Sequence, residues 1–215
     1  MLLTRYRSPY PNYAHLLFVT PSKHLMVLKD GRLKDQAKAV DVNLENVASA
    51  AREHLVHYIV ADHTSSAFYA EVHSSRKLQS PVAFLRRAWQ RKETHFFYGV
   101  PEVLSVPAAV ARTFPELDPW LARLGVRALA PTSGFAAGVT HVRNWEKDLA
   151  TSVFAHEYLH RTPVTLSMVD QLASSTVQRS NQAVLGRGAL EQTRQELWES
   201  PRTGFPPIRE LDLGS

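Results

Sequence analysis

Short apolar runs bounded by turn-forming residues open the chain, and this pattern constrains the fold more than any other feature of the sequence. Runs at 15–19 and 24–29 flank a turn-like spacer, which predicts a β-hairpin. Runs at 57–61 and 67–72 predict a second strand pair. Between the two pairs, residues 43–54 carry apolar side chains at helical spacing. The first third therefore predicts two antiparallel strand pairs with a helix between them.

Beyond these strand pairs, predicted strands and helices alternate. A helix is predicted at 81–89, because serine and proline stand at its start and its apolar side chains form one stripe. A strand at 103–106 follows, and the next helix is expected to stop at Gly125. A strand at 126–130 and a helix from 139 to 155 complete the series. This order predicts an α/β (α+β) fold, with a mixed β-sheet flanked by α-helices.

The length and composition fit one globular domain with tails. The chain has 215 residues, of which 44% are hydrophobic and 21% charged. We expect a domain at 1–185, in which residues 1–56 form the hairpin and inserted helix, and a peripheral C-terminal helix and tail at 186–215. No apolar run is long enough to span a bilayer, and the first residues lack the apolar stretch of a signal peptide. We therefore expect a cytoplasmic protein with no membrane partner.

The net charge favours a polyanionic partner. The absence of cysteine limits the metal ligands and nucleophiles that the chain can offer. The formal net charge is +5, and cationic side chains gain free energy by releasing the counterions of a nucleic acid. Charge alone fits a mildly basic protein without this role equally well. With no cysteine, the chain has no disulfide, thiolate metal site or cysteine nucleophile, so a metal needs His, Asp or Glu ligands.

Four motifs in order resemble the catalytic cores of DDE integrases and transposases, over roughly residues 57–150. They are Asp62-His63-Thr64-Ser65 with the helix at 82–89, Phe97-Tyr98-Gly99-Val100-Pro101, Leu124-Gly125-Val126, and Pro131-Thr132-Ser133-Gly134 with Gly138-Val139. The resemblance implies an RNase H-like fold, a mixed β-sheet flanked by α-helices. It also implies a role in DNA integration or transposition, with DNA, other transposition proteins or further copies of the chain as partners.

Such cores hold two divalent metal ions with three carboxylates, and this sequence departs from that pattern. The second acidic position matches Pro107, and the third matches Arg143. The first falls near Thr20 in the register that we prefer, or at Asp62 in the alternative one. Since Mg²⁺ needs hard oxygen ligands, we expect the ancestral Mg²⁺ site to be lost and the chain to be a pseudoenzyme without a metal cofactor.

A competing motif is His156-Glu157-Tyr158-Leu159-His160, which spells the H-E-x-x-H pattern of zinc metallopeptidases. On a helix it places two imidazoles on one face, with a glutamate beside them as general base. A third zinc ligand is expected from Glu191 or Glu196. The two histidines also continue a stripe from Trp145, so docking on a sheet explains the spacing without a metal. A small zinc metallopeptidase is the alternative function.

Basic residues supply candidate nucleic-acid contacts. Four lie on or just after the helix at 81–89, and two lie at the start of the helix that carries the third family position: Arg86, Arg87, Arg91, Lys92, His141 and Arg143. The first four are interpreted either as phosphate contacts or as a solvated helix face. The last two are candidates for binding an anion where metal binds in the family. A pure protein-interaction module is a third possible function.

Overall fold

The structure is a computed structural model, and it describes residues 8–36, 38–131, 138–185, 191–200 and 204–211. Its main sheet is mixed. In spatial order the strands are β4 (Phe68–Ser74), β3 (His54–Asp62), β1 (Ala14–Val27), β5 (Val103–Ser105) and β6 (Arg127–Leu129). β1, β3 and β4 pair antiparallel, whereas β1, β5 and β6 pair parallel. A short strand, β2 (Leu33–Asp35), pairs with the end of β1. The predicted mixed sheet is confirmed.

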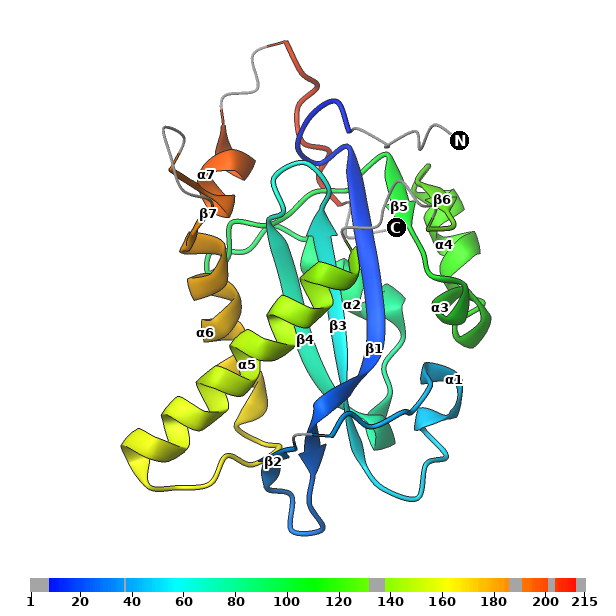
Figure 1. Ribbon diagram of the computed structural model, residues 1–215. Helices are drawn as coiled ribbons and strands as arrows, with labels where there is room; N and C mark the ends of the chain where they lie inside the picture. Colours follow the sequence, from blue (N-terminus) through cyan, green and yellow to red (C-terminus); the bar gives the residue numbers. More distant parts are fainter. Residues whose placement is uncertain (1–7, 37, 132–137, 186–190, 201–203, 212–215) are drawn as a thin grey trace, which may run out of the picture.

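Helices cover both faces of this sheet (Figure 1). One face packs against α1 (Leu44–Val47), α2 (Pro81–Trp89), α3 (Ala108–Thr113) and α4 (Leu117–Arg123). The other packs against α5 (Gly138–His160) and α6 (Val169–Gln182). The remaining elements are η1 (Ser75–Lys77), β7 (Val184–Leu185), β8 (Gln192–Thr193) and α7 (Arg194–Glu199). In Figure 1, α5 crosses in front of the sheet and α2 lies behind it.

Successive side chains of β1 point to opposite faces of the sheet and so contribute to both hydrophobic cores. Leu17 and Val19 point into the core beneath α2, whereas Phe18 packs against the core beneath α5. On α5, Trp145, Leu149 and Val153 recur at helical spacing and are buried against the sheet. The groove described below lies on this α5 face.

The first predicted hairpin is wrong, because residues 15–19 and 24–29 belong mainly to one bent strand. β1 runs through Pro21, and β3 pairs with it from His15 opposite Asp62 to Met26 opposite His54. The register shifts between Pro21 and Met26, so the turn-forming residues bend the strand and do not reverse it. The helix predicted at 43–54 is also wrong in length, since α1 is one turn and β3 already begins at His54.

Two local predictions agree with the structure. The Ser80 side chain accepts a hydrogen bond from the backbone N–H of Val82, and Pro81 occupies the first turn of α2. α4 ends before Gly125, which has a φ of 66° in the left-handed region.

Across the described residues, no helix is long and apolar enough to cross a membrane. The cytoplasmic location stays a prediction.

The C-terminal segment is part of the core and not only peripheral. Trp198 of α7 is 1% exposed and stacks on Phe97 at 4.9 Å between ring centroids. Further on, the backbone carbonyl of Arg209 accepts a hydrogen bond from the N–H of Val100. The expectation of a peripheral tail therefore fails for these described residues, because their apolar side chains complete the core on the α2 face.

Candidate functional site

A groove of about 990 Å³ lies between β1 and α5. A cavity of this size is in the range of small-molecule binding sites. The three positions that matched the family's carboxylates in our preferred register, Thr20, Pro107 and Arg143, all line it. Its other lining residues are Phe18, Val19, Lys23, His24, Asp35, Gln36, Val142, Glu146, Lys147, Ala150, Thr151 and Phe154. Residues far apart in the sequence thus meet in one groove.

The fold explains why these three positions meet. β1 and β5 are parallel neighbours, with His15 opposite Leu104, so both strands run toward the same end of the sheet. Thr20 lies further along β1, and Pro107 follows β5 as the residue before α3. α5 then packs across β1 and brings Arg143 over that end. None of the three side chains carries a carboxylate, which is the ligand class that Mg²⁺ prefers.

Asp62, the alternative first position, lies away from the groove. Asp62 is the last residue of β3 and lies opposite His15 of β1. His15 and Thr20 are five residues apart along β1, which is about 16 Å in a strand. The Asp62 carboxylate is fully buried and accepts hydrogen bonds from Asn12 N (2.7 Å), Ser65 N (2.6 Å) and Ser65 Oγ (2.7 Å). Burial raises the pKa of Asp62, although these hydrogen bonds oppose the shift. Asp62 therefore organises the turn between β3 and β4.

Glu146 is the carboxylate nearest to the third family position, one turn after Arg143 on α5. Its Oε1 accepts hydrogen bonds from Ser22 Oγ (2.5 Å), Lys23 N (2.5 Å) and His24 N (2.9 Å). Because β1 bends here, Lys23 and His24 have no partner in β3, and their backbone N–H groups point to Glu146 instead. Glu146 thus ties α5 to the bend of β1, and this oxygen is occupied by protein donors.

A histidine beneath Glu146 adds to this tie. Trp145 Nε1 donates a hydrogen bond to His57 Nδ1 (3.2 Å), and His57 Nε2 lies 3.8 Å from Glu146 Oε1. Burial opposes ionisation of Glu146, but nearby His57 and the hydrogen bond from Ser22 outweigh it and lower its pKa to about 2. The carboxylate therefore stays charged in its buried position.

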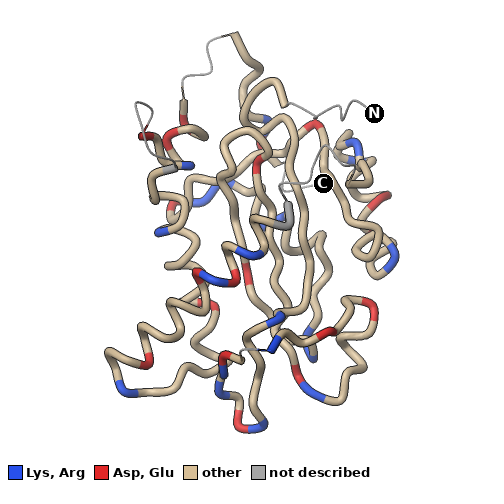
Figure 2. Tube along the Cα trace, in the orientation of Figure 1, with Lys and Arg blue, Asp and Glu red and all other residues tan. Residues whose placement is uncertain are grey.

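Three exposed cations line the groove: Lys23, Arg143 and Lys147. Among the described residues, no ion pair or side-chain hydrogen bond engages any of these three cationic groups. The groove's carboxylates are Asp35 and Glu146, and the latter is turned inward onto β1. Figure 2 shows charges of both signs along the first half of α5 and few on its outer half. The groove thus presents free positive charge beside an apolar wall.

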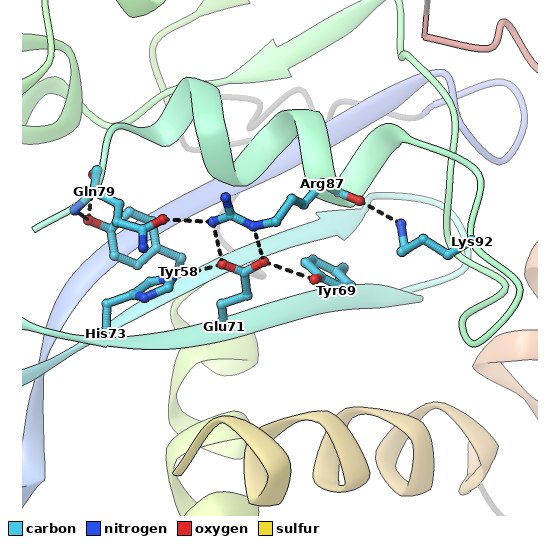
Figure 3. Close-up of polar contacts among 7 residues, drawn as sticks. All are labelled: Tyr58, Tyr69, Glu71, His73, Gln79, Arg87 and Lys92. Atoms are coloured by element: carbon cyan, nitrogen blue, oxygen red, sulfur yellow. Dashed lines mark hydrogen bonds and ion pairs between the residues drawn. The ribbon is translucent and has the colours of Figure 1, made fainter. Parts of the chain in front are cut away.

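Two of the predicted nucleic-acid contacts on α2 are instead engaged within the protein (Figure 3). Arg87 forms a bidentate ion pair with Glu71 of β4, at 2.8 and 2.7 Å. Burial disfavours the charged form of Glu71, but its bonds to Arg87 and His73 prevail and lower its pKa to about 2. The Lys92 ammonium donates to three backbone carbonyls at and after the end of α2, and burial lowers its pKa to about 8. The Arg87–Glu71 pair joins α2 to the edge strand β4, whereas the Lys92 ammonium caps the end of α2.

The remaining cations of this group also lie apart from the groove. Arg86 and Arg91 are exposed, and Arg91 pairs with Glu210 at 3.0 Å. α2 packs on the sheet face opposite to α5, so its cations and the groove face different sides of the molecule (Figure 1). The cations of α2 and those of the groove therefore form two separate surfaces.

His141 and Arg143 do not form one anion site. Two residues apart on a helix, their side chains point about 200° apart. Arg143 lines the groove, whereas His141 does not. Burial, together with the charges of Arg194 and His63, lowers the pKa of His141 to about 4. His141 therefore belongs to a different surface of α5.

The H-E-x-x-H motif lies at the end of α5. The rings of His156 and His160 are 4.5 Å apart, and Glu157 accepts a hydrogen bond from the backbone N–H of Val164. Glu196, an expected third ligand, caps the start of α7 through the N–H of Thr193. Within the described part of the chain, no three His, Asp or Glu side chains are grouped to hold a metal ion. Neither Glu191 nor Glu196 therefore completes a zinc site with these histidines.

Sequence reasoning missed Lys23, Lys147 and Phe154 as groove residues. Lys147 carried a signal, since it stands one turn after Arg143 on the same helix face. Lys23 and the N–H groups that hold Glu146 carried none, because their placement depends on the bend of β1, which was predicted as a hairpin turn.

Comparisons with solved structures agree on the fold, although no family model and no curated protein matches the chain. The simian T-cell lymphotropic virus intasome in complex with PP2A regulatory subunit B56 gamma matches with a TM-score of 0.58 and 16% identity, over 97% of this chain and 61% of that one. This chain thus spans under two thirds of that neighbour.

Two structures of the HTLV-2 integrase catalytic core domain with magnesium are also similar, each with a TM-score of 0.53. The dimeric form is 15% identical, over 91% of this chain and 100% of that one. The trimeric form is 13% identical, over 89% and 99%. The chain therefore has the RNase H-like fold of retroviral integrase catalytic cores.

Proposed function

We propose that this protein is an integrase-core-like, nucleic-acid-binding protein that has lost two-metal catalysis. The observation that carries the proposal is the groove: its three family positions hold Thr20, Pro107 and Arg143, and cations project into it. The role in DNA integration or transposition rests on the resemblance and on the shared fold.

The magnesium ions of the neighbouring integrase cores do not fit these residues. A threonine hydroxyl is a weak ligand, proline offers no side-chain donor, and the Arg143 guanidinium repels a cation. Two carboxylates remain in the groove, but Glu146 Oε1 already accepts three hydrogen bonds from β1. We therefore propose no catalytic step through a metal ion.

A groove with free cations suits a polyanion. Lys23 projects from β1, and Arg143 and Lys147 project from α5, so positive charge lies on both walls. Contacts of this kind recognise phosphate groups and carry no base sequence. Binding is therefore expected to be sequence-tolerant and to weaken steeply with added salt. Because two neighbours are dimeric and trimeric forms, self-association is part of the proposal.

Fluorescence anisotropy with labelled DNA, single-stranded and duplex, tests this function. The Arg143→Ala and Lys147→Ala variants should each weaken binding and reduce its salt dependence. Arg123→Ala on α4 removes the same charge from the opposite face of the sheet, and it should leave binding unchanged. The protein should also show no cleavage or joining of DNA with Mg²⁺ or Mn²⁺. Metal-dependent strand cleavage, or absence of binding at low salt, contradicts the proposal.

A further inference from the structure

One stripe of α5 carries two cations followed by two aromatic side chains. Arg143, Lys147, Phe154 and Tyr158 lie at positions i, i+4, i+11 and i+15. At 3.6 residues per turn, these positions fall within about 60° of one another around the helix. The stripe thus runs from the groove toward the free end of α5, which projects past the sheet in Figure 1.

The two aromatic side chains on this stripe are unusually exposed. Phe154 is 69% exposed and Tyr158 is 59% exposed. Their rings are nearly parallel, at 20°, with centroids 6.3 Å apart, and Phe154 forms part of the groove wall. The Arg161 guanidinium lies 5.0 Å above the centroid of the Tyr158 ring. Exposed aromatic side chains grouped in this way indicate a binding surface.

The charge beside these rings indicates what the surface binds. Lys23 on one wall of the groove and Arg143 and Lys147 on the other have no anionic partner among the described residues. A cationic track that leads to aromatic rings is the arrangement by which proteins bind single strands of nucleic acid. The phosphates follow the cations, and unpaired bases stack on the rings.

We propose that the groove and this stripe of α5 bind single-stranded nucleic acid in preference to duplex. Phosphates lie along Lys23, Arg143 and Lys147, and two bases stack on Phe154 and Tyr158. A duplex cannot use the rings, because its bases already stack on one another. The proposal rests on the proposed function, since it names the form of nucleic acid that the same groove takes.

Anisotropy titrations with a mixed-sequence oligonucleotide of about 16 nucleotides, single-stranded and as a duplex, test the preference. Phe154→Ala and Tyr158→Ala should each weaken single-strand binding about 5- to 150-fold, or ~1–3 kcal/mol. Duplex binding and the salt dependence should change little, because the phosphate contacts remain. Phe154→Trp and Tyr158→Phe should retain affinity, and Phe205→Ala, which removes an exposed ring elsewhere, is the matched control.

Three outcomes overturn the proposal, and they separate it from the proposed function. If both forms bind equally and the alanine variants change affinity less than about twofold, while Arg143→Ala still weakens binding, the groove binds nucleic acid without stacking. If neither form binds at low salt, the proposed function fails as well. If the alanine variants bind normally but lose a dimer seen by light scattering, the stripe is a protein interface.

Discussion

Replacing Glu146 by glutamine tests whether this carboxylate ties α5 to the bend of β1. Glutamine keeps the shape and an acceptor oxygen, but it removes the charge that His57 and the three donors from β1 stabilise. The folded-state pKa is about 2, against 4.5 for an ordinary glutamate. At ~1.4 kcal/mol per pKa unit, the charged form contributes about 3 kcal/mol. Little of this is lost to solvent, because the side chain is only 9% exposed.

The pH dependence follows from the direction of the shift. Because the pKa is lower in the folded protein, the contribution is fully present above the unfolded pKa of about 4.5 and is lost as the pH falls toward 2. Urea unfolding followed by tryptophan fluorescence should show Glu146→Gln about 2–3 kcal/mol less stable at pH 7. The difference from the natural protein should shrink at pH 3.

Glu45→Gln is the matched control for this experiment, because Glu45 pairs with Arg112 at the surface and should contribute less than about 1 kcal/mol. Two results refute the reasoning. One is a Glu146→Gln variant as stable as the natural protein at pH 7. The other is a stability difference that grows as the pH falls.

Three further variants test other parts of the structure. Asp62→Ala should lower the free energy of unfolding by about 2–4 kcal/mol, because it leaves the buried Asn12 and Ser65 donors unpaired, and nucleic-acid binding by the folded protein should not change. Trp198→Ala should cost about 3–5 kcal/mol in the same unfolding assay, whereas a peripheral tail predicts no loss. His156→Ala should leave zinc content, measured by elemental analysis, unchanged; loss of one bound zinc per chain contradicts this.

Local signals in the sequence predicted much of the fold. Ser80 with Pro81 marked the start of α2, Gly125 marked the end of α4, and the runs that became β3 and β4 were recognised as a strand pair. Each of these features depends on neighbours in the sequence, so periodicity and capping chemistry were sufficient.

The errors arose where long-range contacts decide the structure. Residues 20–23 look like a turn, but pairing with β3 on one side holds both halves of β1 in one strand. Trp198 is in a short helix with no distinctive stripe, and its long-range contacts with His15 and Phe97 place it in the core. The tie through Glu146 joins residues more than a hundred positions apart, so no local pattern predicts it.

The sequence predicted the candidate site only in part, because long-range contacts also decide which of its side chains are free. Family spacing identified Thr20, Pro107 and Arg143, and the structure places all three in the groove. The basic residues on and after α2 were chosen by their charge and their place on a predicted helix, and neither shows that Arg87 already pairs with Glu71. Basic residues in a sequence indicate a binding surface only where the fold leaves their side chains without ion-pair partners.

The most direct test of the central claim is the salt dependence of single-strand binding in EDTA. The natural protein should bind equally well in EDTA and in Mg²⁺, because the proposed contacts are phosphate to cation. Combined replacement of Lys23, Arg143 and Lys147 by alanine should reduce the slope of log affinity against log salt by about 2, since each phosphate contact contributes ~0.7. An unchanged slope, or binding that requires Mg²⁺, contradicts the account.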